Sequence, residues 1–176
     1  MSIAVRSLVI GVVLSAFLVV MIPASTLDSA PRFTRSQAYG DWLLNCFEPA
    51  SKSNKQQKES CVLRQQLTHQ SGKRLILITI VQEQKKQVSV RLILPLGFDI
   101  PKGVKLQVDG GSSYPLQILS CHNVGCQAEA KMSSKMRRSF VRGKMMHVVM
   151  TSSGDNKTLK FPLSLRGISN GINSIK

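Results

Sequence analysis

Cys121, His122 and Cys126 are the residues whose types and spacing come nearest to a chemical site, because thiolate sulfur and imidazole nitrogen are the usual ligands of zinc. A structural zinc site, however, needs a fourth ligand and is typical of a reducing compartment. The Cys-x4-Cys spacing also differs from the Cys-x-x-Cys motif of thiol redox proteins. We therefore predict that the chain binds no metal and needs no cofactor.

The other groups that could catalyse a reaction are scattered along the chain. The three histidines, His69, His122 and His147, fall in different expected elements, and the nine acidic residues form no cluster. No Gly-x-Ser-x-Gly elbow, Walker A loop or Gly-x-Gly-x-x-Gly motif occurs. The sequence therefore predicts a protein that is not an enzyme, with an unrecognised hydrolase as the enzymatic alternative.

The densest basic segment of the chain spans residues 131–144 and contains no acidic residue. Ser133 or Ser134 is suited to cap a short helix there, and Gly143 is suited to end it. Such a segment is either a solvated helix face or a patch that binds anions. The candidate anion-binding residues are Lys131, Lys135, Arg137, Arg138, Arg142 and Lys144.

The formal net charge of +15 makes acidic partners more suitable than basic ones. Nucleic acid is not expected, because aromatic residues, which would stack on bases, make up only 5% of the chain. Anionic glycans, sialic acids or lipid head groups on a host-cell or envelope surface fit the charge better.

Residues 1–25 have the pattern of a secretory signal peptide, which also argues against contact with cytoplasmic nucleic acid. Arg6 precedes an uncharged apolar run at residues 8–22, and small residues follow around Ala24. A membrane-spanning helix needs about 20 apolar residues, so an uncleaved anchor is the less favoured alternative. We expect export to the periplasm or to the outer membrane and cell surface of a Gram-negative bacterium, with no stable transmembrane segment after cleavage.

Four cysteines follow the predicted leader, and an even number in an exported chain indicates disulfides. Three pairings are possible among them. Local pairing is the simplest, since each pair of neighbouring cysteines brackets a turn-like segment. The candidates are Cys46, Cys61, Cys121 and Cys126.

After a flexible arm at residues 26–38, residues 39–176 are expected to form one domain. Residues 48–60 are polar and predict an exposed loop, whose Lys52, Lys55 and Lys58 would keep it solvated. Apolar alternation predicts strands elsewhere, and residues 75–81 are apolar enough for a strand that is buried on both faces. Strands are expected at residues 39–47, 61–68, 75–81, 88–94, 104–109, 114–119, 145–151 and 157–163.

Two short helices complete the expected fold. Met136 and Phe140 would face the core from the helix in the basic segment, and residues 167–175 carry isoleucines at helical spacing. Pro162 indicates a strand near the edge of a sheet. The fold class is therefore mainly β: a single-domain antiparallel β-sandwich or bent barrel with one or two short helices and two disulfides.

Several short motifs in a fixed order resemble the invasion-associated locus B family of bacterial exported proteins over residues 39–172. No single motif is specific, but their common order is not expected by chance. The family's usual aromatic after the last glycine is replaced by Ile168. The motifs are Gly40-Asp41-Trp42, Pro95-Leu96-Gly97, Pro101-Lys102-Gly103-Val104, Val108-Asp109-Gly110, Cys121-x3-Gly125-Cys126-x-Ala128 and Pro162-x-Ser164-Leu165-x-Gly167.

The resemblance implies a non-enzymatic protein that acts in invasion of, or attachment to, host cells, red blood cells in particular. It also favours the local disulfide pairing Cys46–Cys61 and Cys121–Cys126. Because family members also occur in bacteria that do not invade cells, a periplasmic envelope scaffold or binding module is the alternative function.

Overall fold

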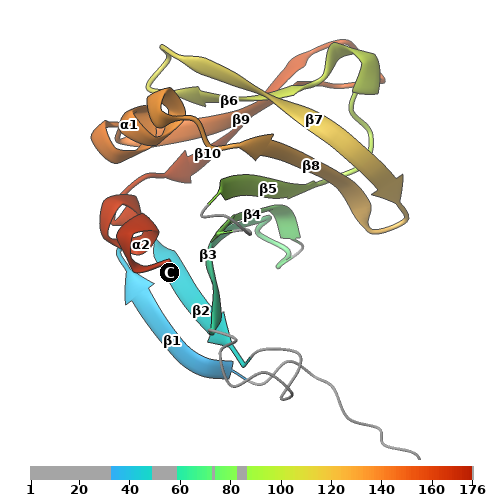
Figure 1. Ribbon diagram of the computed structural model, residues 1–176. Coiled ribbons are helices and arrows are strands. Elements are labelled where there is room, and N and C mark those ends of the chain that lie inside the picture. Colours follow the sequence, from blue (N-terminus) through green and yellow to red (C-terminus); the bar gives the residue numbers. More distant parts are fainter. Residues whose placement is uncertain (1–32, 49–58, 73, 83–86, 176) are drawn as a thin grey trace, which may run out of the picture.

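A computed structural model describes residues 33–48, 59–72, 74–82 and 87–175 (Figure 1). The signal peptide predicted at residues 1–25 lies outside the described residues, as do the first part of the predicted arm and the three lysines Lys52, Lys55 and Lys58.

Ten antiparallel strands form one continuous sheet, in the order β1-β2-β3-β4-β5-β8-β7-β6-β9-β10. The mainly-β antiparallel fold with two short α-helices and two disulfides is thereby confirmed, and β3, β4 and β5 form the predicted meander. The strands are β1 (Phe33–Tyr39), β2 (Trp42–Phe47), β3 (Ser60–Thr68), β4 (Arg74–Gln82), β5 (Val88–Leu94), β6 (Val104–Val108), β7 (Ser113–His122), β8 (Gly125–Lys131), β9 (Met145–Thr151) and β10 (Thr158–Ser164).

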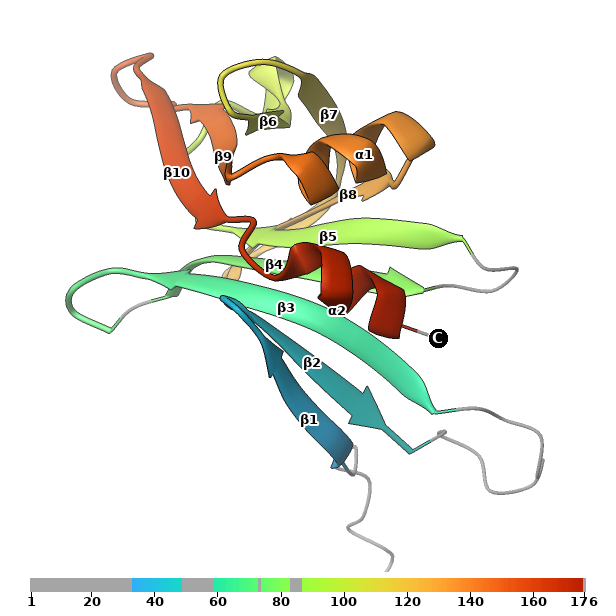
Figure 2. The ribbon, with the colours of Figure 1, turned by 90° about the vertical axis from the view of Figure 1, so that its left-hand side faces the viewer.

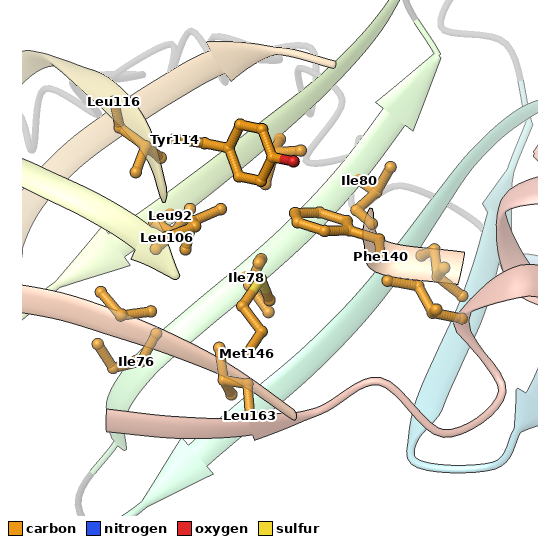
Figure 3. Close-up of a cluster of buried hydrophobic side chains, with 14 of the residues drawn as sticks. Ile76, Ile78, Ile80, Leu92, Leu106, Tyr114, Leu116, Phe140, Met146 and Leu163 are labelled. Carbon is orange, nitrogen blue, oxygen red and sulfur yellow. The ribbon is translucent and has the colours of Figure 1, made fainter. Parts of the chain in front are cut away.

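The sheet bends over, so that strands from its two halves face each other across one core (Figures 1 and 2). Ile76 and Ile78 of β4 point toward Leu106 of β6 and Met146 of β9, and all four side chains are fully buried (Figure 3). Alternate residues of β4 and β6 therefore supply the core, because successive side chains of a strand point to opposite faces.

The prediction that residues 75–81 are buried on both faces is wrong. Ile76, Ile78 and Ile80 are fully buried, whereas on the other face only Val81 is buried and Leu77 and Thr79 are half-buried. The bent sheet encloses its core on one face, and no second layer covers the other face of β4 to the same extent. An apolar run without alternation is thus compatible with a strand that is buried on one side.

Two strands lie where the sequence predicted none. β1 covers residues 33–39, most of which were assigned to a flexible arm, and it lacks an apolar period because it is an edge strand whose side chains are almost all exposed. β8 begins inside the Cys-x4-Cys segment, whose two central residues, Asn123 and Val124, form the hairpin turn between β7 and β8. Its small and polar residues, with Ala128 facing the core, gave no strand signal.

Both predicted helices are present: α1 (Ser134–Arg142) and α2 (Ile168–Ser174). The Ser133 hydroxyl accepts a hydrogen bond from the amide of Met136 at 3.1 Å, and this caps the first turn of α1 as predicted. Gly143 ends the helix. A single 3-10 turn, η2 (Ile100–Lys102), precedes β6. Among the described residues, no helix is long and apolar enough to cross a membrane.

The first and the last of the sequence motifs, Gly40-Asp41-Trp42 and Pro162-x-Ser164-Leu165-x-Gly167, contact each other in the fold, although more than a hundred residues separate them. The Asp41 carboxylate, in the β1–β2 turn, pairs with the Arg166 guanidinium at 2.5 and 3.0 Å, and this hydrogen bonding lowers the pKa of Asp41 to about 2. The Trp42 indole N–H donates to the Ser164 carbonyl oxygen at 2.9 Å. We call this contact the terminal clasp; it joins the first two strands to the segment that leads from β10 into α2.

Two glycines allow the backbones of the terminal clasp to approach closely. Gly40 has a φ of 59° and Gly167 a φ of 88°, in the region that favours glycine. A Cβ atom at Gly167 would lie 2.1 Å from the Tyr39 carbonyl oxygen. Pro162 lies on β10, the other edge of the sheet, as its type predicted.

Candidate anion-binding site

The four cysteines form the two local disulfides that the family resemblance favoured. Cys46 and Cys61 are directly opposite each other on β2 and β3, and Cys121 and Cys126 face each other across the β7–β8 hairpin. Disulfide-bonded sulfur atoms are not thiolates and cannot bind a metal as thiolate ligands. This excludes a thiolate metal site at Cys121, His122 and Cys126. It also excludes one at Cys46 and Cys61, which lie beside Glu59. Two disulfides are typical of an extracytoplasmic protein.

The three histidines remain apart in the fold. His69 lies at the β3–β4 turn, where its Nδ1 is 3.1 Å from the Ser71 hydroxyl; His122 ends β7, and His147 lies on β9. The structure therefore does not bring the imidazoles together into one site.

The six cations of the basic segment all lie exposed on or beside α1. Lys131 ends β8 and Lys144 leads into β9, and the other four belong to the helix. Met136 and Phe140 point inward, as predicted, and the outer side of α1 carries the charged residues together with Val141. We call the exposed side chains of Lys131, Lys135, Arg137, Arg138, Arg142 and Lys144 the basic surface.

Aromatic packing and hydrogen bonds fix α1 on the sheet. The Phe140 ring is fully buried and meets the Tyr114 ring of β7 edge-on, with centroids 6.3 Å apart (Figure 3). The Tyr114 hydroxyl lies 2.5 Å from the Ser139 hydroxyl and donates to the Lys135 carbonyl oxygen at 3.3 Å. Burial of one such aromatic side chain stabilises the fold by about 1.5–3 kcal/mol, so the cations are carried by a firmly held helix.

The sequence does not show that an acidic residue lies beside the basic surface. The Asp109 carboxylate accepts hydrogen bonds from the backbone amides of Lys144 and Met145 at 3.0 and 2.9 Å. These two bonds lower the pKa of Asp109. Asp109 also has a positive φ of 46°. The Asp-Gly-Gly composition is typical of a turn, and this was the feature of the sequence that indicated an unusual backbone conformation here. One end of the basic surface is therefore partly neutralised.

Two grooves flank the ridge that Arg138 and Arg142 form along α1. One, of about 370 Å³, lies toward β6 and β7, and its lining includes Lys135 and Asp109. The other, of about 380 Å³, lies between α1 and α2, which are neighbours in both views of the molecule (Figures 1 and 2). We call the second the inter-helix groove; its lining residues are Arg137, Arg138, Val141, Arg142, Ser169 and Asn173.

Sequence reasoning found the arginines of the inter-helix groove but not the residues that α2 contributes. The Arg137 guanidinium donates to the Asn173 side-chain oxygen at 2.6 Å, a contact between residues 36 positions apart. Ser169 and Asn173 are polar residues of α2, a helix that was predicted from the spacing of its isoleucines. That spacing shows which side of the helix is buried, but not which residues lie next to its polar side.

Comparison with known proteins gives one consistent result. The family model described as invasion associated locus B (IalB) protein matches residues 42–176. Two invasion protein B homologues from Brucella abortus, of strain 2308 and of biovar 1 strain 9-941, are each 25% identical over 144 residues, which is 81% of this chain and 80% of theirs. The crystal structure of invasion associated protein B from Bartonella henselae superimposes with a TM-score of 0.69 at 24% identity, covering 81% of this chain and 95% of that one, so the fold is shared.

Proposed function

The chain belongs to the invasion associated locus B family, and we propose that it is an exported, non-enzymatic protein that attaches the bacterium to an anionic host-cell surface. The observation that carries this proposal is the basic surface, six exposed cations on one short helix and its flanks. Uncompensated like charge opposes folding slightly, so a purely structural helix gains nothing from it. The names of the Brucella and Bartonella proteins, which refer to invasion, support the same role.

The proposal includes export by the signal peptide at residues 1–25. The two disulfides support it, because such bonds form and persist in oxidising compartments. Outside the cytoplasm the available polyanions are glycans and lipid head groups. Both would be attracted by this chain, whose formal charge is +15, or +14 once Arg6 is removed with the signal peptide.

Attachment through the basic surface has a measurable consequence. Exposed charges act over about 8 Å at physiological salt, so binding of the purified protein to erythrocytes or to heparin should weaken steeply as salt rises. The triple substitution R137Q/R138Q/R142Q should reduce this binding with little change in melting temperature, because exposed substitutions usually change stability by less than about 0.5 kcal/mol. If this variant adheres as well as the parent at low and at physiological salt, the basic surface is only a solvated helix face.

A periplasmic envelope scaffold or binding module is the second candidate function. The disulfides favour it equally, since the periplasm is also oxidising. Protease treatment of intact bacteria separates the two candidates: attachment to host cells requires a protease-accessible pool, whereas an envelope role predicts protection until the outer membrane is opened.

A further inference from the structure

We propose that the inter-helix groove binds a single sulfate or phosphate monoester group of a host glycan. This inference rests on the proposed function, because it names the ligand chemistry of the basic surface. It goes further by assigning recognition to one groove instead of to diffuse charge over the whole segment.

The charge distribution selects this groove over its neighbour. Both grooves share Arg138 and Arg142, but the one toward β6 and β7 also contains the Asp109 carboxylate, which would repel an anion. The inter-helix groove has three guanidinium groups, and its lining includes no acidic residue. An oxyanion therefore meets more uncompensated positive charge between the helices than on the other side of the ridge.

The guanidinium groups are available to a ligand. Within the part of the chain that the structure describes, neither Arg138 nor Arg142 forms an ion pair with an acidic side chain. Arg137 is held in place through one donor by Asn173, and a guanidinium has five N–H donors in a fixed fork. Such forks match the geometry of sulfate and phosphate oxygens better than a lysine ammonium does.

An apolar side chain in the same groove suits a ligand that carries an organic group beside its anion. Val141 is 42% exposed although it lies between the arginines. The carbon face of a sugar ring can cover such a side chain while its ester group contacts the arginines. The groove volume of about 380 Å³ lies within the roughly 300–1,000 Å³ typical of small-molecule sites, so one substituted sugar is of suitable size.

Two triple variants with the same change in charge test this assignment. R137Q/R138Q/R142Q removes the guanidinium groups of the groove, and K131Q/K135Q/K144Q removes three charges of the basic surface that lie outside it. The probe is a heparin-derived disaccharide that carries sulfate esters, titrated into each purified protein by calorimetry, with its desulfated form in parallel. Vesicles that contain phosphatidic acid represent a lipid source of a phosphate monoester.

The groove variant should lose at least about tenfold in affinity for the sulfated disaccharide, since each charge-assisted hydrogen bond to a guanidinium is worth about a tenfold change or more. The lysine variant should lose less than about threefold. R137K/R138K/R142K, which keeps the charge but not the fork, should also bind more weakly than the parent. The desulfated disaccharide should bind none of the proteins measurably.

Other outcomes overturn the inference in distinct ways. Equal losses in the two glutamine variants would show diffuse charge attraction, and the groove assignment would fail while the proposed function stands. Equal binding of the desulfated sugar would exclude the ester as the recognised group. Tighter binding to vesicles than to the disaccharide, lost in the groove variant and kept in the lysine variant, would assign the groove to a lipid head group. If all variants bind the disaccharide, erythrocytes and heparin like the parent, the proposed function fails as well.

Discussion

The terminal clasp makes a quantitative prediction through Gly167. Replacement of Gly167 by alanine places a Cβ atom 2.1 Å from the carbonyl oxygen and 2.4 Å from the carbonyl carbon of Tyr39. Both are backbone atoms, so the clash cannot be relieved by a side-chain rotation. The two segments must separate, and the hydrogen bond from the Asp41 amide to the Arg166 carbonyl oxygen, 3.1 Å in the native chain, would be lost.

The expected loss of stability has two parts. A non-glycine residue at a φ of 88° is strained by about 1–2 kcal/mol. The lost backbone hydrogen bond contributes about 1 kcal/mol more. The total of about 2–3 kcal/mol corresponds to a decrease in melting temperature of about 4–12 °C for a chain of this size.

Urea denaturation under oxidising conditions measures this loss, with Gly97→Ala as the matched control. Gly97 has a φ of 96°, but a Cβ atom there meets no other atom within 4 Å. The control should therefore show the conformational strain alone, about 1–2 kcal/mol. If the two variants have the same free energy of unfolding, close packing at the clasp does not contribute, and our account of this contact is wrong.

Two further predictions concern the disulfides and the acid stability of the clasp. Replacing Cys46 and Cys61 by serine should lower the free energy of unfolding by about 3 kcal/mol, because these residues are 15 positions apart. Replacing Cys121 and Cys126, only 5 positions apart, should lower it by about 2 kcal/mol. Equal denaturation midpoints of the two variants would contradict this. The pKa of Asp41 is about 2 in the folded chain and 3.8 ordinarily, so its stabilisation is complete above pH 3.8 and is lost as the pH falls toward 2. Asp41→Asn should remove that part of the acid destabilisation, and an unchanged pH profile of melting temperature would refute the assignment.

Local signals in the sequence predicted local structure well. The caps of α1, its inward-facing Met136 and Phe140, and the strands with clear alternation could be read from neighbouring residues alone. The disulfide pairing was left open by the residues and came from the family resemblance, and both bridges are confirmed.

Features that depend on contacts between distant segments could not be predicted in this way. β1 is a strand because β2 lies beside it, and its own residues carry no alternation. The carboxylate of Asp109 lies 3.0 Å from the Lys144 amide, 35 residues away, which only the fold can show. The same holds for Asn173, whose contact with Arg137 defines one side of the inter-helix groove.

The most direct test of the attachment role is an infection assay with the native bacterium. A strain that lacks the gene is complemented with the wild-type chain or with R137Q/R138Q/R142Q, and attachment to host cells is counted at equal amounts of exported protein. We predict that deletion lowers attachment, that the wild-type chain restores it, and that the triple variant does not. Full restoration by the triple variant, or normal attachment of the deletion strain, would contradict the claim that this protein attaches the bacterium through its basic surface.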